Sequence, residues 1–87
     1  MAYAVELAPT AEAQLAALPA KARRQAASRI EALKDDPRPH GSLKLQGRVD
    51  LYRIRAGNYR VIYQIRDAAL VVLVLKVADR KDVYRGL

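Results

Sequence analysis

Four arginine side chains have spacings that would gather them on one face of a β-sheet. Arg53 and Arg55 are two positions apart in an alternating segment, so a strand there would project both to the same side. Arg60 follows a predicted turn and can lie beside them on the next strand, and Arg80 comes just after the last predicted strand. Because like charges that face each other destabilise a sheet, this grouping indicates a face that binds something negatively charged.

The charge of the chain is concentrated in its second half. Of the 87 residues, 16 are lysine or arginine and 9 are aspartate or glutamate, which gives a net charge of +7. Residues 1–43 hold six basic and five acidic side chains, whereas residues 44–87 hold ten basic and four acidic ones. This asymmetry favours a polyanionic partner, either a nucleic acid or an acidic protein. The alternative is a solvated sheet face whose arginines pair with Asp50, Asp67 and Asp79.

The residues that most ribonucleases, metalloenzymes and nucleotide-binding proteins use are scarce in this chain. It has no cysteine, which excludes thiolate metal sites, and His40 is its only histidine, which excludes a paired-histidine mechanism within one chain. Asp35 and Asp36 are better explained as the end of a helix than as a magnesium site. The four glycines are too scattered to form a phosphate-binding loop. We therefore expect neither a metal nor another cofactor.

A strand and two helices precede the strands that carry the arginines. Apolar periodicity and turn residues predict a strand at residues 2–7, helices at 11–18 and 20–33, and strands at 51–55, 59–66 and 70–78. Thr10 is the predicted N-cap of the first helix, and Pro19 separates the two helices. The last strand is nearly continuous in valine and leucine, which predicts a central strand buried on both faces.

This β-α-α-β-β-β order predicts a single α+β domain over residues 1–87. Its sheet should be twisted and largely antiparallel, with the αα-hairpin on one face and the arginines on the other. The chain shows no basic segment followed by an apolar run at its start, and its longest apolar stretch is too short to span a bilayer. We therefore expect a cytoplasmic protein without membrane contact.

The basic segments belong to two longer motifs. The first is Lys44–Gly47, with the sequence KLQG, followed by Leu51–Tyr63, with the sequence LYRIRAGNYRVIY. The second is Val77–Tyr84, with the sequence VADRKDVY. In order and in predicted secondary structure, both resemble the motifs of the RelE/ParE superfamily, the toxins of type II toxin–antitoxin systems. The resemblance covers nearly the whole chain and includes Leu18-Pro19 and Asp36-Pro37.

In that superfamily the RelE branch cuts mRNA in the ribosomal A site, whereas the ParE branch inhibits DNA gyrase. The resemblance implies that the RelE-type catalytic residues are Arg53, Arg55, Arg60, Arg80 and Tyr84. Because every one of these positions holds a basic residue or tyrosine, the resemblance favours a ribosome-dependent mRNA endonuclease, a toxin that blocks translation. Further RNA contacts are expected from Lys44, Arg48, Lys76 and Lys81.

One departure from the family pattern concerns the proton transfer. Arg53 and Arg55 stand where the best-known RelE-type toxins have lysines, and arginine is a poor general base because it keeps its proton at neutral pH. The residue that would deprotonate the attacking 2′-hydroxyl therefore stays open. We expect Arg60 and Arg53 to clamp the scissile phosphate, and Arg80 to stabilise or protonate the leaving 5′-oxygen. Arg55 should orient the 2′-hydroxyl and assist its deprotonation, and Tyr84 should stack on or orient a nucleotide.

Two other functions remain alternatives. A ParE-like inhibitor of DNA gyrase would act by binding protein, without catalysis. A catalytically inactive RNA-binding module is suggested by the arginines that replace lysines. The resemblance also implies several partners: a cognate antitoxin that neutralises the toxin, the ribosome and mRNA, and operator DNA bound by the toxin–antitoxin complex through the antitoxin.

Overall fold

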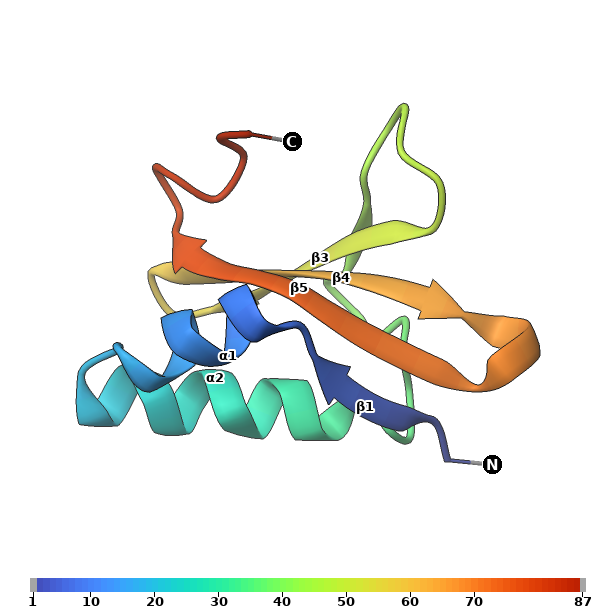
Figure 1. The fold of residues 1–87 in the computed structure, drawn as a ribbon, viewed down its shortest axis with the longest axis horizontal. Helices are drawn as coiled ribbons and strands as arrows, with labels where there is room; N and C mark the ends of the chain where they lie inside the picture. The colour runs from blue at the N-terminus through green and yellow to red at the C-terminus, as the bar shows by residue number, and fades with distance from the viewer. Residues whose placement is uncertain (1, 87) are drawn as a thin grey trace.

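A five-stranded sheet with two helices on one of its faces forms the body of the protein (Figure 1). The computed structural model describes residues 2–86. The elements in chain order are β1 (Ala4–Leu7), α1 (Pro9–Ala16), α2 (Ala20–Ala32), β2 (Leu43–Lys44), β3 (Leu51–Ala56), β4 (Tyr59–Arg66), the 3₁₀-helix η1 (Asp67–Ala69) and β5 (Val71–Asp79). The predicted α+β class and the helical hairpin on one face are confirmed.

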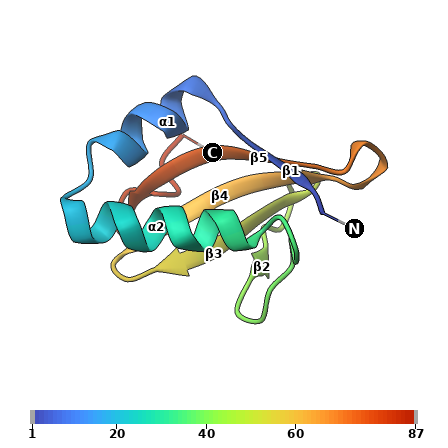
Figure 2. The same ribbon diagram turned by 90° about the horizontal axis from the view of Figure 1, so that it is seen from below.

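The strands are arranged in the order β1-β5-β4-β3-β2. β1 runs parallel to β5, and every other neighbouring pair is antiparallel. On the helix side, α1 packs against β5, and α2 crosses β3 and β4 (Figure 2). The edge strand β2 is an addition to the predicted order, since two residues are too few to show an alternating pattern.

Prolines mark the start of both helices. α1 begins at Pro9, with Ala8 as its N-cap and no side-chain cap, so the predicted capping role of Thr10 was wrong. Proline is favoured at this first position because its ring fixes φ and the missing N–H would have no partner there. α2 begins at Ala20 with Pro19 as its N-cap, so Pro19 does separate the two helices.

The apolar core fills the space between the helices and the sheet. β5 contributes Val72, Val74 and Val77, all of which are at most 1% exposed. Their irregular spacing is explained by a bulge at Leu75, because β4 residues 62 and 63 pair with Lys76 and Val74 and leave Leu75 without a partner. The other side of β5 is only partly buried, so the expected burial on both faces holds for the helix side alone.

A polar network joins the start of the chain, the loop after α2 and the turn after β4. Asp67 accepts hydrogen bonds from the Tyr3 hydroxyl at 2.6 Å and from Nη2 of Arg38 at 2.8 Å. The Arg38 guanidinium also lies 5.2 Å from the centre of the Tyr52 ring. The hydrogen bonds from Arg38, and then from Tyr3, lower the pKa of Asp67 to about 2. Asp67 is therefore held as a carboxylate. It follows the last residue of β4, whereas Arg60 lies near the first, so the two are at opposite ends of this strand.

Candidate active site

Three of the four arginines meet on the face of the sheet that is turned away from the helices, which we call the outer face. Arg53 on β3 pairs with Ile62 on β4 and with Leu43 on β2. Arg55 on β3 pairs with Arg60 on β4. Residues that pair directly across a sheet project to the same side. The register therefore places the three guanidinium groups on neighbouring positions of two strands.

Arg53 is the buried member of this group. It is 7% exposed and is the only buried charged side chain among residues 2–86. Its Nε is buried without a hydrogen-bond partner in that part of the chain. A buried donor without an acceptor costs free energy, and a charged donor costs more than a neutral one. An anionic ligand that supplies oxygen acceptors suits such a group.

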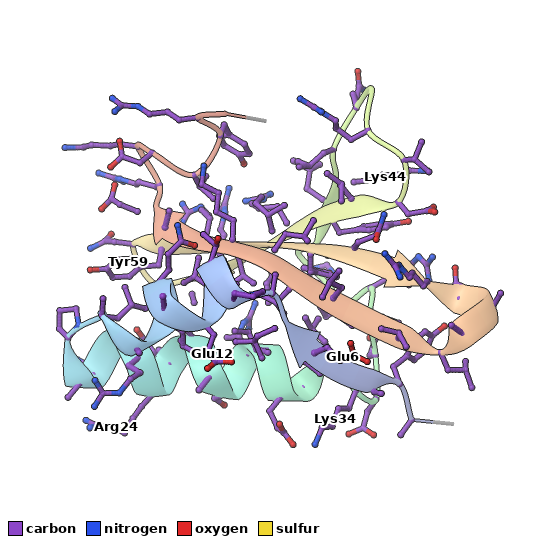
Figure 3. All side chains as sticks on the ribbon, viewed as in Figure 1. Glu6, Glu12, Arg24, Lys34, Lys44 and Tyr59 are labelled. Carbon is purple, nitrogen blue, oxygen red and sulfur yellow. The ribbon has the colours of Figure 1, made fainter. Side chains whose placement is uncertain are left out.

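Arg60 lies at the centre of the cluster and is tied to the turn between β3 and β4. Its Nη1 donates to the carbonyl oxygens of Gly57 and Tyr59, both at 2.9 Å. Tyr59 marks this end of the sheet in Figure 3. The pKa of Arg60 is lowered from its ordinary value, first by burial and then by the positive charges of Arg55 and Arg53. The lowered pKa therefore reflects burial first, and then a crowding of like charges that this fold accommodates.

The C-terminal segment, residues 80–86, brings Arg80 and Tyr84 to the same place. It follows β5 and turns over the side of the sheet away from the helices (Figure 1). The backbone N–H of Arg80 donates to the carbonyl of Asn58 at 2.9 Å, which fixes it beside the β3–β4 turn. The charges of Arg80 and Tyr84 both influence the pKa of Arg60, so both lie within its electrostatic reach. All five predicted catalytic residues are thus gathered around Arg60.

Lys76 and Val83 hold the C-terminal segment on the outer face. The Lys76 ammonium donates to the backbone carbonyl oxygens of Asp82 and Arg85. The Val83 side chain is fully buried, as is Ile62, which pairs with Lys76 across the sheet. Lys76 was predicted to bind RNA, but its ammonium is engaged with the backbone that positions Arg80 and Tyr84.

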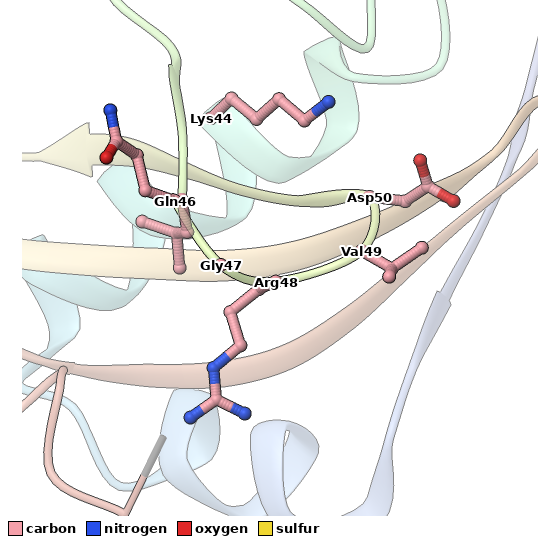
Figure 4. A pocket seen from close by; sticks show the side chains of 7 residues that line it. Lys44, Gln46, Gly47, Arg48, Val49 and Asp50 are labelled. Atoms are coloured by element: carbon pink, nitrogen blue, oxygen red, sulfur yellow. The ribbon is translucent and has the colours of Figure 1, made fainter.

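The other residues predicted to bind RNA lie outside the cluster. Lys81 is exposed on the C-terminal segment. Lys44 and Arg48 belong to the segment of residues 44–50, which lines an open cavity of about 680 Å³. Figure 4 shows their side chains extending from this segment in different directions. Leu43, rather than Lys44, is the β2 residue beside Arg53.

The acids of the chain do not neutralise the cluster. Asp67 is bound to Arg38 and Tyr3, and Asp79 accepts from the backbone N–H of Lys81 at 2.8 Å. Within residues 2–86 the ion pairs are Glu31–Lys34, Arg38–Asp67 and Asp82–Arg85. None of them includes an arginine of the cluster. The alternative of a solvated face whose arginines pair with Asp50, Asp67 and Asp79 is therefore contradicted.

Three further residues shape the site, and sequence reasoning missed the role of two of them, Ile62 and Val83, whereas Gly57 was predicted to lie in a turn. Ile62 lies on the same face of β4 as Arg60. An apolar residue on this otherwise polar face was a sign that another segment covers Ile62. Val83, which covers this region as part of the C-terminal segment, had no periodic pattern to reveal it. Gly57 has a φ of +60°, a conformation that glycine adopts without strain. It allows the tight turn that places Arg60 opposite Arg55.

Between residues 2 and 86, histidine, aspartate and glutamate side chains do not gather in any group of three that could hold a metal ion. Neither helix in this range is long and apolar enough to cross a membrane.

Known proteins resemble this chain in sequence and in fold. A family model described as ParE toxin of type II toxin–antitoxin system, parDE, matches residues 5–84. The mRNA interferase toxin RelE of Escherichia coli K12 is 32% identical over 88 residues, which cover 97% of this chain and 92% of that protein.

Solved structures agree with these matches. In the archaeal RelE–RelB complex from Pyrococcus horikoshii, one chain has a TM-score of 0.79 and 31% identity, with 95% of this chain and 100% of that chain covered. One chain of the intact Escherichia coli RelBE toxin–antitoxin complex has a TM-score of 0.79 and 30% identity, with 90% of this chain and 96% of that chain covered. The fold, the spacing of the motifs and these matches lead to one conclusion: the chain belongs to the RelE/ParE superfamily of toxins from type II toxin–antitoxin systems.

Proposed function

We propose that this toxin is a metal-independent endoribonuclease that cuts mRNA at the ribosome and so blocks translation. The observation that carries the proposal is the cluster around Arg60, in which the guanidinium groups share the outer face without a carboxylate partner among residues 2–86. Guanidinium groups bind phosphate oxygens in pairs and keep their charge. They suit a reaction in which negative charge builds up on a phosphorane. The RelE relative is itself named an mRNA interferase.

The geometry suggests a division of roles for attack by the 2′-hydroxyl of the RNA. Arg60 and the buried Arg53 clamp the non-bridging oxygens of the scissile phosphate. Arg80, held beside the β3–β4 turn, stabilises the negative charge that develops on the leaving 5′-oxygen. Arg55 orients the 2′-hydroxyl from the strand next to Arg60. Tyr84, which is 49% exposed, offers a ring on which a nucleotide can stack.

The composition of the cluster also suggests a role for the ribosome. It contains no histidine, and the ammonium of Lys76 on β5 is engaged with the C-terminal segment. Catalysis then depends on charge stabilisation and on alignment of the 2′-oxygen with the phosphorus and the leaving oxygen. Alignment alone can contribute several kcal/mol to lowering a barrier. A ribosome that holds mRNA in the reactive conformation supplies what the arginines do not.

The test is primer extension on an mRNA that is being translated in a reconstituted system containing the toxin. The wild type should produce discrete in-frame cuts. Arg60→Ala and Arg80→Ala should each lower the cleavage rate by about a hundredfold, since each removes a charge that stabilises the transition state. Arg24→Ala, on the exposed surface of α2, is the matched control for loss of one charge and should cleave normally. Full activity in both cluster variants contradicts the proposal.

A gyrase-inhibiting toxin is the second candidate, because the matching family model is that of the ParE toxin. It predicts intact transcripts and induced DNA breaks when the protein is expressed. A catalytically inactive RNA-binding module predicts salt-dependent RNA binding without cuts. The primer-extension assay, run beside an assay for DNA breaks, separates all three.

The remaining parts of the proposal concern the setting in which the toxin acts. We propose that the whole chain, residues 1–87, acts as one domain in the cytoplasm, where ribosomes and mRNA are found. A cognate antitoxin should neutralise it, since the related RelE proteins were solved in complexes with RelB. An antitoxin with an acidic or amphipathic segment would complement the net charge of +7. The toxin–antitoxin complex would contact operator DNA through the antitoxin.

A further inference from the structure

A polar cavity lies between α2 and the edge of β3, next to the catalytic cluster. Its volume is about 310 Å³, and it is lined by Gln25, Ser28, Arg29, Arg55, Ala56 and Gly57. Figure 2 shows α2 crossing in front of β3, with the β3–β4 turn beside the N-terminal half of the helix. β2 pairs only with Tyr52 and Arg53, so residues 54–56 form a free strand edge. Arg55 belongs to both the cavity and the cluster, so the two are neighbours.

The lining of this cavity is suited to an anion. The residues that line it include two arginines, Arg29 and Arg55, together with Ser28 and Gln25, and none of them carries a carboxylate. Within residues 2–86 none of these four side chains takes part in an ion pair. Two positive charges beside hydrogen-bond donors are the usual surroundings of a bound phosphate.

Gly57 connects the cavity rigidly to the catalytic cluster. A Cβ at this position would lie 3.0 Å from Oε1 of Gln25, so the turn approaches α2 closely. The carbonyl oxygen of the same residue accepts the 2.9 Å hydrogen bond from Arg60. The turn is therefore in contact with the cavity on one side and with the cluster on the other. A ligand in the cavity would therefore lie on the other side of this turn from Arg60.

We infer that this cavity is a subsite for the RNA phosphate next to the scissile one, and that Arg29 binds it. The inference rests on the proposed endoribonuclease function and extends its substrate site beyond the scissile bond. Arg53 and Arg60 would clamp the scissile phosphate of an RNA. The RNA chain would then pass Arg55 and reach the cavity. A volume of about 310 Å³ is at the small end for ligand pockets, which suits a phosphate with part of its ribose.

The test measures binding of short RNAs to the full chain by fluorescence anisotropy. The RNAs carry a 2′-O-methyl group at the scissile position to prevent cleavage. In a second series, one flanking phosphate at a time is replaced by an uncharged methylphosphonate. For the wild type, one of these replacements should weaken binding about tenfold, as expected for the loss of one charged hydrogen-bonded contact. Arg29→Ala should weaken binding of the fully charged RNA by a similar factor. This variant should then bind the fully charged RNA and the RNA with that methylphosphonate equally well.

Arg24→Ala is the matched control, since it removes the same charge from the same helix without touching the cavity. Its side chain lies on the side of α2 away from the sheet (Figure 3). This variant should discriminate between the RNAs as the wild type does. Arg29 is exposed, and thermal unfolding of both variants checks that the fold is retained.

The possible outcomes separate this inference from the proposed function. If Arg29→Ala still distinguishes the two RNAs while Arg60→Ala abolishes cleavage, the subsite is wrong and the endoribonuclease stands. The subsite is also wrong if no methylphosphonate replacement weakens binding of the RNA to the wild type. That result would be expected if the cavity took a phosphate of ribosomal RNA instead. A loss that depends on the identity of the base rather than on the phosphate also overturns it. If the wild type neither binds nor cuts RNA, both proposals fail.

Discussion

Arg55 on β3 lies directly opposite Arg60 on β4, so two guanidinium groups face each other across an antiparallel pair. Paired like charges destabilise a sheet, and this arrangement costs the fold stability in favour of a binding site. We predict that Arg55→Gln raises the free energy of unfolding by roughly 0.2 to 1 kcal/mol while it lowers mRNA cleavage. Urea denaturation measures the first effect, and primer extension measures the second.

Arg24→Gln serves as the control for this prediction, since Arg24 lies on the exposed surface of α2 and has no cross-strand partner. It should leave both the stability and the cleavage unchanged. A lower stability of Arg55→Gln would contradict the idea that the fold tolerates this pair at a cost.

The buried Nε of Arg53 leads to a second prediction of the same kind. Replacement by methionine keeps an apolar chain that reaches about as far as the buried Nε and removes a buried donor that has no partner in the described chain. Arg53→Met should therefore stabilise the fold by about 1 to 3 kcal/mol. It should also abolish cleavage, because the clamp on the scissile phosphate is lost.

Arg53→Lys separates packing from charge in this case. It keeps a positive charge at the position, and the resemblance to RelE-type toxins implies that lysine is compatible with activity there. We expect it to retain much of the cleavage. If Arg53→Met unfolds the protein instead of stabilising it, the guanidinium has a structural role that its surroundings do not indicate.

The arginine face was predictable because a two-residue period is a local property of the sequence. Arg53, Arg55 and Arg60 could be assigned to one face from their spacing alone, and the turn at Ala56-Gly57-Asn58 indicated that their strands are neighbours. The bulge at Leu75 was not predictable, because nothing local distinguishes it within a run of valine and leucine.

The position of the C-terminal segment was equally hidden, since it depends on contacts between distant residues. Lys76 reads as a free basic residue in the sequence, and only the fold brings the carbonyl groups of Asp82 and Arg85 to its ammonium. In the same way, Arg29 and Arg55 are far apart in the sequence, because the loop after α2, strand β2 and residues 45–50 lie between them. No motif could therefore indicate that they share a cavity.

The contacts of Lys76 predict that it acts through the C-terminal segment rather than by touching RNA. Lys76→Ala should release residues 80–86 and displace Arg80 and Tyr84. A misplacement of about 1 Å can reduce a rate a hundredfold, so we expect a loss of cleavage of that order. Hydrogen exchange should become faster in residues 82–85 while the exchange of β3 and β4 stays unchanged.

Lys81→Ala is the control for the Lys76 variant, because it removes a nearby exposed charge and keeps the hydrogen bond from the Lys81 backbone to Asp79. It should leave hydrogen exchange in the C-terminal segment as it is. If Lys76→Ala loses cleavage with no change in exchange, the ammonium contacts RNA directly and the positioning role is wrong.

The network around Asp67 predicts how stability depends on acid pH. The pKa of Asp67 is lowered from 3.8 to about 2 in the folded state, first by the hydrogen bond from Arg38 and then by that from Tyr3. Between these values the unfolded chain binds a proton that the folded chain does not, so stability falls as the pH decreases. The contribution is fully present above about pH 4 and is lost as the pH falls through about 2.

Urea denaturation at several values between pH 2 and pH 6 should therefore show a steeper loss of stability for the wild type than for Asp67→Asn. Tyr3→Phe removes one of the three hydrogen bonds to the carboxylate and keeps the two from Arg38, so its slope should lie between those of the wild type and Asp67→Asn. Cleavage at neutral pH should be unaffected in Tyr3→Phe, since the network lies at the end of β4 opposite to Arg60. Equal slopes for the wild type and Asp67→Asn would mean that this carboxylate does not hold the far end of the sheet together.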